Sequence, residues 1–136
     1  MGRNLLGISF DRVELMNRAL DGAWKRNKVL NHNLSNVNTP GYKRKDVDFQ
    51  SVLKKEMDDS SGFKIKDSGM VSKEDAKDEF QVEVEGGYST RRDGNNVNAD
   101  TEMAELTKNY ITYNSLIGQT SKEFKKWKMI IDEGGR

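Results

Sequence analysis

Several residue types are absent from this sequence or scarce in it, and each absence excludes a class of protein. The 136 residues contain no cysteine, which excludes a disulfide framework, a thiolate zinc site and a cysteine nucleophile. The single histidine, His32, has no cysteine or tight carboxylate cluster to complete a metal or catalytic site. The sequence also lacks a glycine-rich phosphate loop and a readable nucleophile–base pair. It therefore predicts no catalytic residue, no cofactor, no metal and no small-molecule substrate.

An excess of charge of one sign and long apolar runs are also missing. The 23 basic and 22 acidic residues leave a net charge of +1, without the basic excess of a nucleic-acid-binding protein. No run approaches the roughly 18–20 apolar residues of a membrane span, and Asp11 and Arg12 interrupt the apolar stretch near the start. Neither membrane insertion nor a cleaved signal peptide is therefore expected. Because only 34% of the residues are hydrophobic, we expect partners to complete the buried surface.

The first part of the sequence carries a heptad pattern, in which stripe positions recur alternately three and four residues apart. This spacing predicts a long helix from about residue 8 to residue 36, with an apolar stripe along one face. Eight of its ten positions are apolar or alanine. The stripe positions are Leu6, Ser9, Val13, Met16, Leu20, Ala23, Asn27, Leu30, Leu34 and Val37.

The last part of the sequence repeats this pattern. It predicts a second helix from about residue 99 to residue 132, with Asn98 or Asp100 as the N-cap and Gly134-Gly135 at its end. Eight of its nine stripe positions are apolar or aromatic. They are Met103, Leu106, Tyr110, Tyr113, Ile117, Thr120, Phe124, Trp127 and Ile131.

Two long helices of nearly equal length predict a mainly α protein. The simplest arrangement is an antiparallel, coiled-coil-like pair packed along the two stripes. Between them we expect a turn, a short helix starting at Asp48, and a small β-containing insert with strand-like alternation in residues 63–66 and 80–85. The expected organisation is an N-terminal helix in residues 1–38, the insert in 39–98 and a C-terminal helix in 99–136, forming one structural unit.

The end of the first predicted helix coincides with a turn motif. Pro40 disfavours a helical conformation at the preceding residue, so the helix is expected to stop near Asn38. Pro-Gly at the centre of residues 39–42 fits a type II turn, and the asparagines nearby can bond the turn or the last carbonyls of the helix. Turn chemistry alone indicates no more than a well-made helix stop. The candidate motif residues are Asn33, Asn36, Asn38, Thr39, Pro40, Gly41 and Tyr42.

Residues 33–43 nevertheless resemble the N-terminal signature of bacterial flagellar axial proteins, which form the rod and the hook. In that family the first helix ends in a pattern similar to the Asn-x-x-Asn-x-Asn-Thr-Pro-Gly-Tyr-Lys found here. The sequence departs from the family at His32 and Ser35, where small residues are usual. Residues 46–49 and 94–103 resemble segments of the proximal rod proteins, and Asn109 and Tyr113 continue the likeness.

The resemblance implies a structural subunit of the flagellar basal-body rod, required for motility. Such subunits pass unfolded through the flagellar type III export apparatus without a cleaved leader, and they self-assemble by packing their terminal helices in a tube wall. The implied neighbours are copies of the chain, FlgC, FlgF, the adaptor FliE and the export-gate and MS-ring region. The implied location is the basal body, on the periplasmic side of the inner membrane or within the cell wall.

The predicted stripes supply the candidate assembly residues. They are Leu20, Leu30, Leu34, Met103, Leu106, Tyr110, Tyr113, Ile117, Phe124 and Trp127.

Two alternatives fit parts of the sequence. A helical-hairpin adaptor or chaperone-like protein would explain the stripes, but not the turn motif and its C-terminal companion. Within the family, the alternative is another proximal rod protein, FlgC.

The roles of two aromatic side chains are left open by the sequence: Trp24 either widens the buried face or meets a neighbouring subunit, and His32 is expected to be structural or exposed.

Overall fold

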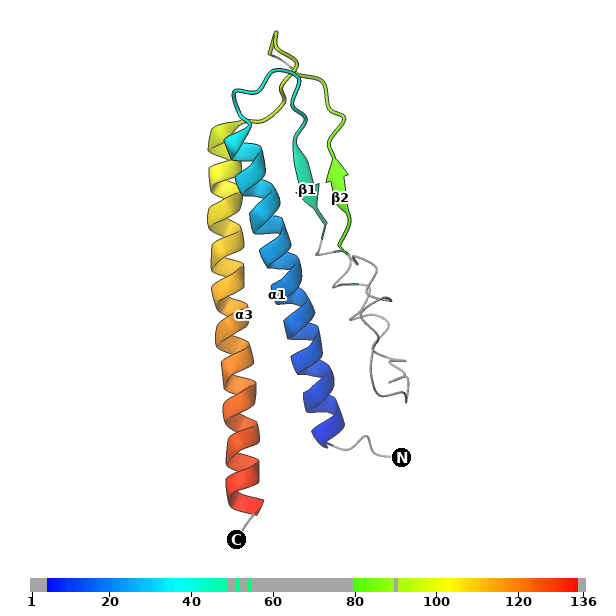
Figure 1. Cartoon of the computed structure of the whole chain (residues 1–136). Coiled ribbons are helices and arrows are strands. Elements are labelled where there is room, and N and C mark those ends of the chain that lie inside the picture. Colours follow the sequence, from blue (N-terminus) through cyan, green and yellow to red (C-terminus); the bar gives the residue numbers. More distant parts are fainter. Residues whose placement is uncertain (1–4, 49–50, 52–53, 55–79, 90, 135–136) are drawn as a thin grey trace.

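The chain folds into a hairpin of two long helices with a small sheet against one of them. The computed structural model describes residues 5–48, 51, 54, 80–89 and 91–134. In chain order the elements are α1 (Leu5–Ser35), β1 (Lys45–Val47), β2 (Val82–Val84) and α3 (Ala99–Gly134). The two helices lie side by side, and β1 packs against α1 with β2 at its outer edge (Figure 1). This confirms the predicted mainly α fold with a small β insert.

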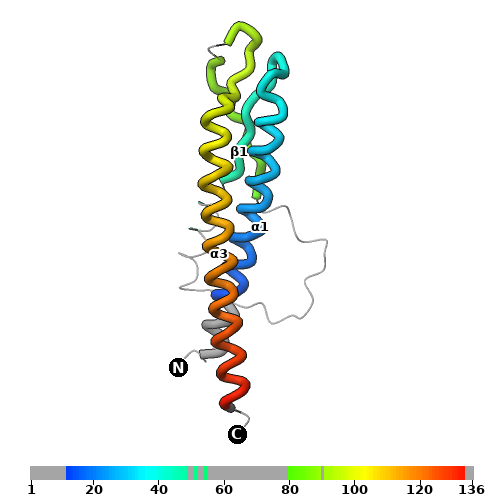
Figure 2. Tube along the Cα trace, turned by 90° about the vertical axis from the view of Figure 1, so that its left-hand side faces the viewer, coloured from blue at the N-terminus to red at the C-terminus, as the bar shows by residue number. Residues whose placement is uncertain are grey.

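The helices run antiparallel. The Asn109 side-chain amide donates to the backbone carbonyl of Ala23 at 2.8 Å, and the Asn33 amide donates to the Glu102 carboxylate at 2.9 Å. Residue numbers therefore rise along α1 as they fall along α3. The start of α1 and the end of α3 lie at one end of the hairpin, and the loops that join the helices to the ribbon lie at the other (Figure 2). The last turns of α3 extend beyond the first turn of α1 (Figure 1).

The ends of the helices follow the predicted local chemistry. Gly41 has a φ of 71°, and the Tyr42 N–H donates to the Thr39 carbonyl at 3.3 Å, as the central glycine and closing bond of a type II turn require. At the start of α3 the Asn98 side chain accepts the backbone N–H of Asp100 at 2.9 Å. Asn98 is therefore the N-cap.

The α1 stripe lies in the hairpin as predicted. Ala23 and Leu30 are fully buried, and the other stripe positions from residue 13 onward are buried or half-buried. Leu20 and Leu34 are among the half-buried ones. The side chains of the first two stripe positions lie outside the described residues.

The buried face of α3 differs from the prediction by one line of residues. Leu106, Tyr113, Thr120 and Trp127 are buried or half-buried as expected. The other predicted line is exposed: Met103 by 58%, Tyr110 by 64%, Ile117 by 42%, Phe124 by 50% and Ile131 by 72%. Each of the first four is replaced in the buried face by its preceding residue: Glu102, Asn109, Leu116 and Glu123.

The predicted packing of the two helices along their stripes therefore holds for only one of the two lines of the α3 stripe. Successive helical residues lie about 100° apart around the axis, so the exposed line occupies a flank of α3 rather than the face toward α1. One neighbouring helix covers only one face. Sequence periodicity cannot say which face it is when the apolar arc is wider than the contact.

The sheet is a two-stranded antiparallel ribbon. Lys45 pairs with Val84, and Val47 pairs with Val82. Val47 and Phe80 form a small buried cluster, and Val29 of α1 packs against this cluster.

Only part of the insert follows the sequence prediction. β2 lies within the predicted strand at 80–85, but β1 was not predicted because its Lys-Asp-Val sequence shows no clear alternation. The predicted strand at 63–66 and most of the predicted short helix lie outside the described residues. Asp48 does accept the backbone N–H of Ser51 at 3.2 Å, as an N-cap would.

Candidate functional site

The turn motif and residues 93–102 meet at the loop end of the hairpin. Polar side chains, several of them buried, form hydrogen bonds that link the two segments. We call the side chains of Asn33, Arg44, Asn95, Asn96 and Glu102 the polar clasp. Asn33, Asn95 and Glu102 are each 0% exposed. Polar groups without water must find protein partners, so a buried network that is fully bonded specifies one arrangement of the segments around it.

Asn33, in the last turn of α1, joins that helix to both the ribbon and α3. Its side-chain oxygen accepts the backbone N–H of Lys45 at 3.0 Å and the hydroxyl of Tyr42 at 3.1 Å. Its amide nitrogen donates to the Lys45 carbonyl at 2.6 Å and to Glu102 at 2.9 Å. The amide is therefore saturated by groups from three segments.

Asn95 binds the turn that follows α1 from the opposite loop. Its amide nitrogen lies 2.9, 3.0 and 2.9 Å from the carbonyl oxygens of Asn36, Val37 and Thr39. Its oxygen accepts the N–H of Val97 at 2.8 Å. These carbonyls belong to the turn that follows α1, so Asn95 holds that turn against the loop that precedes α3.

Arg44 is the charged centre of the clasp. Its guanidinium donates to the carboxylates of Glu102, Glu85 and, at 3.0 Å, Asp46. Its backbone N–H donates to Asn96 at 2.6 Å. Burial by itself lowers the pKa of Arg44, but the bonds and charges of Glu102 and Asp46 outweigh it and raise that pKa.

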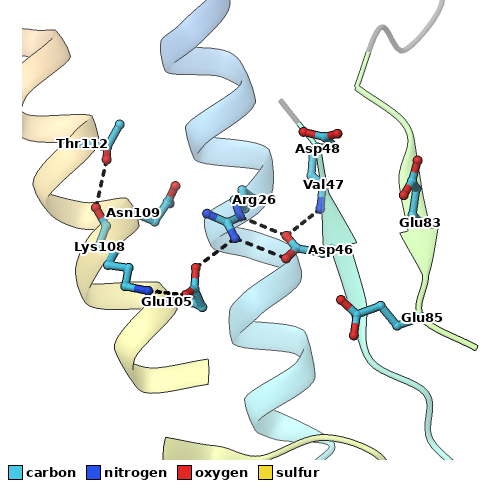
Figure 3. Close-up of a pocket in the computed structure, with 10 residues that line it drawn as sticks. All are labelled: Arg26, Asp46, Val47, Asp48, Glu83, Glu85, Glu105, Lys108, Asn109 and Thr112. Atoms are coloured by element: carbon cyan, nitrogen blue, oxygen red, sulfur yellow. Dashed lines mark hydrogen bonds and ion pairs between the residues drawn. The ribbon is translucent and has the colours of Figure 1, made fainter. Parts of the chain in front are cut away.

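A second arginine anchors the ribbon to both helices (Figure 3). Arg26 of α1 donates to Asp46 of β1 at 2.9 Å and to Glu105 of α3 at 3.0 Å. Burial acts to raise the pKa of Asp46, but the bond from Arg26 and others outweigh it and lower that pKa. The bond from Lys108, with help from Arg26, lowers the pKa of Glu105.

The predicted motif residues divide into those that join the clasp and those that shape the turn. Asn33 belongs to the clasp, and the Tyr42 hydroxyl donates to it. The Gly41 N–H donates to the Asp93 carbonyl in the opposite loop at 2.7 Å. Asn36 is half-buried, whereas Thr39 and Pro40 are exposed.

The remaining residues of the motif region have smaller roles. Asn38 is exposed and no side-chain hydrogen bond joins it to the described residues. His32 is exposed, and its ring nitrogen lies 2.8 Å from the hydroxyl of Tyr42, in line with a structural or exposed role.

Four clasp residues were not among the predicted site residues: Arg44, Asn95, Asn96 and Glu102. Only their positions in the sequence could have indicated these residues. Asn95, Asn96 and Glu102 lie in the family-like segment 94–103, and Arg44 directly follows the turn motif. Glu102 directly precedes Met103 of the predicted apolar stripe. A charged residue beside such a stripe is ordinarily expected to face solvent, so the sequence does not indicate that Glu102 is buried.

The chemistry of the clasp is that of a structural joint. Its polar groups bond mainly to one another and to backbone atoms. In the part of the chain that the structure describes, no three His, Cys, Asp or Glu side chains are grouped so that they could hold a metal ion. No described helix is both long and apolar enough to cross a membrane.

Comparison with known proteins gives a consistent set of relatives, although no protein-family model matches the chain. The chain is 32% identical to the flagellar basal body rod protein FlgB of Bacillus subtilis (strain 168) over 122 residues, covering 90% of this chain and 94% of that protein. It is 30% identical to FlgB of Aeromonas hydrophila, covering 91% and 92%, and 28% identical to FlgB of Borreliella burgdorferi, covering 90% and 97%. These similarities extend over nearly the whole of each protein, and the chain belongs to the FlgB family of flagellar basal body rod proteins.

Proposed function

We propose that the chain is a structural subunit of the proximal rod, and that it enters the wall of the rod through its terminal helices. Membership of the FlgB family supports the rod, rather than an adaptor or chaperone, as the destination. The observation that carries the mode of assembly is the exposed apolar line on α3, which we call the α3 flank. It consists of Met103, Tyr110, Ile117 and Phe124.

The α3 flank lies on the side of the helix that faces away from the ribbon. Glu105, Lys108 and Thr112 line the space toward the ribbon, and Tyr110 is more than a quarter turn away from them around the axis. Single exposed apolar residues are ordinary, but a line that runs through three heptads marks an interaction surface. Tyr110 and Phe124 offer the largest contact areas.

The two helices have different parts in this proposal. Leu20, Leu30 and Leu34 lie in the hairpin and hold α1 to α3. The α3 flank faces adjacent subunits. The polar clasp closes the hairpin at one end, so that one protomer presents the flank as a rigid surface. The three sequence zones then act as one structural unit.

The proposed neighbours are those that the sequence resemblance implies. They are further copies of the chain, FlgC, FlgF, FliE and the export-gate and MS-ring region. The proposed location is the periplasmic side of the inner membrane or the cell wall, reached through type III export. A contact map from chemical crosslinking of isolated basal bodies tests this, and the lack of any link to FliE or the MS-ring region would exclude the proximal position.

The assembly surface is tested by truncating its aromatic residues. In cells that lack the gene, the variant Tyr110→Ala with Phe124→Ala is expected to fold but to enter isolated basal bodies poorly and restore little motility. Ile111→Ala is the control, because Ile111 is 60% exposed on the same helix but points away from the flank. Equal incorporation of the double variant and the control would show that the α3 flank faces solvent in the rod.

A further inference from the structure

Trp24 is an exposed aromatic side chain on a helix whose other large apolar side chains are covered. It is 54% exposed, and it is the only large apolar side chain of α1 exposed among the described residues. The Lys28 ammonium lies over its ring, 3.5 Å from the ring centre, and restrains the ring by a cation–π contact. Trp24 therefore lies outside the core of the hairpin, with its ring already ordered on the surface.

Trp24 lies on the same face of the hairpin as the α3 flank. The Ala23 carbonyl accepts the Asn109 amide at 2.8 Å, so these two residues meet in the contact between the helices. The next residue of each helix is turned by about 100° around the axis. Because the two right-handed helices run antiparallel, both turns lead to the same side. Trp24 and Tyr110 therefore stand side by side on one face, at the same level along the hairpin.

This face is turned away from the ribbon. Arg26 bonds to Asp46 of β1, and it lies about 200° around α1 from Trp24. On α3 the residues that line the space toward the ribbon include Lys108, which also lies about 200° from Tyr110. The ribbon therefore leaves the face with Trp24 and Tyr110 uncovered.

Exposed residues seven positions before and after Trp24 and Tyr110 extend the face by one level in each direction. We call these six residues the open face. They are Asn17, Trp24 and Asn31 of α1 and Met103, Tyr110 and Ile117 of α3. None of the six is charged, although 33% of the residues in the chain are. Few charges together with tryptophan, tyrosine and methionine are typical of the centre of a protein interface.

We propose that the open face receives one amphipathic helix of an adjacent rod subunit, and that Trp24 is its main contact on α1. Levels seven residues apart are separated by about 10.5 Å, which is the repeat of an apolar heptad stripe on a helix. An extended strand places side chains on one face about every 6.8 Å and does not match these levels. This inference rests on the proposed function, which supplies the adjacent subunit.

The inference extends the proposed contact from one helix to two. The α3 flank alone offers a single line of side chains, whereas Trp24 supplies a second side, so that a partner helix is held along the junction of α1 and α3. Large aromatic side chains at the centre of an interface carry most of its binding energy. Trp24 and Tyr110, at the middle level, are therefore expected to contribute most.

Truncating Trp24 tests its place in the contact. Tyr88→Ala is the matched control, because Tyr88 is fully exposed but lies in the loop between β2 and α3. We expect Trp24→Ala and Tyr88→Ala to melt like the unmodified protein. In cells that also make the unmodified protein, Trp24→Ala should be about tenfold under-represented in isolated basal bodies, Trp24→Phe less so, and Tyr88→Ala not at all.

Two results of this experiment would overturn the inference. Incorporation of Trp24→Ala equal to that of the control would show that Trp24 faces solvent in the rod. A melting temperature of Trp24→Ala clearly below that of the unmodified protein would assign the side chain to the fold of the monomer.

The partner is identified by photo-crosslinking in isolated basal bodies. The aromatic probe p-benzoylphenylalanine replaces Trp24 in one variant and Tyr110 in another. We expect both probes to couple to the same helix of another subunit, mapped by mass spectrometry. If the probe at residue 110 couples to another subunit, but the probe at residue 24 couples to none or to a different helix, the inference is overturned while the proposed function stands. If the unmodified protein is absent from basal bodies, the proposed function itself fails.

Discussion

At the scale of single residues, this protein depends on asparagine. Asn33 uses both ends of its short amide, and Asn95 uses its amide nitrogen, to hold segments that are distant in the sequence. An amide suits this task because it donates and accepts at once without carrying charge into a buried site. The motif that ends the first helix therefore also supplies one side of the tertiary contact with the segment before and at the start of α3.

Removing the amide of Asn95 should destabilise the folded chain. Asn95→Ala removes a fully buried amide that bonds the turn after α1 and the Val97 N–H, which should lower the free energy of unfolding by about 1–3 kcal/mol. Asn38→Ala, in the same motif region but exposed, should change it by less than about 0.5 kcal/mol. Urea denaturation of the purified proteins measures both. Equal effects would argue against a specific role of the clasp.

Two glycines should respond in opposite ways to alanine. Gly41 has a φ of 71°, so Gly41→Ala should cost about 1–2 kcal/mol through backbone strain even though the space around it is open. Gly118 lies inside α3 with nothing within 4 Å of an added Cβ, so Gly118→Ala should stabilise by about 0.5–1 kcal/mol. Thermal melts distinguish the two signs.

The double change Pro40→Ala with Gly41→Val should impair rod incorporation more than monomer folding.

At the scale of elements, the ribbon is held to the helices by ion pairs as much as by apolar packing. Its buried apolar contact is limited to Val47, Phe80 and the partly buried Val29. The Arg26 and Arg44 guanidiniums supply the rest through Asp46. A three-residue strand has little stability of its own, so its place depends on these side chains.

The ion pairs predict a loss of stability in acid. The pKa values of Asp46 and Glu105 are lowered in the folded chain, so the unfolded chain binds more protons in acid and stability rises with pH. The stabilisation is present above about pH 5 and is lost as the pH falls through the lowered pKa values. Asp46→Asn should lower stability at pH 7 and flatten this dependence. Denaturant midpoints between pH 7 and pH 3 measure it, and parallel curves for both proteins would contradict the assignment.

At the scale of the whole molecule, the hairpin has one covered face and one flank open to partners. The contact between α1 and α3 combines apolar side chains with buried polar ones, and a second line of large apolar side chains on α3 points outward. The arrangement is a poor solution for an isolated monomer and a reasonable one for a subunit whose neighbours cover the flank. A heterologous contact that does not close on itself extends into a helical assembly, which is the geometry of a rod.

Stability and assembly should therefore respond to different leucine and tyrosine truncations. Leu30 is 0% exposed, so Leu30→Ala should lower the free energy of unfolding by about 2–4 kcal/mol. Tyr110→Ala on the α3 flank should leave monomer stability within about 0.5 kcal/mol. Denaturation of the purified variants compares them directly. A large loss for Tyr110→Ala would place it in the monomer core instead.

Local chemistry determined much of this protein. Pro40 and Gly41 define the turn, Asn98 caps α3, and two apolar periodicities specify two long helices, because each of these effects acts within a few residues. The same sequence signals placed Asn33 and Tyr42 in the motif and identified the family resemblance that the relatives confirm. The buried stripe of α1 followed as well, since its small and apolar residues lie on one narrow face.

Only the tertiary structure decided which face of α3 is covered and what the polar residues on it do. Glu102 and Asn109 are buried because Arg44, Asn33 and the carbonyl of Ala23 reach them from other segments. Contacts between residues some 60 to 90 positions apart leave no periodic trace in the sequence. The apolar line of Met103, Tyr110, Ile117 and Phe124 was thereby left on the surface.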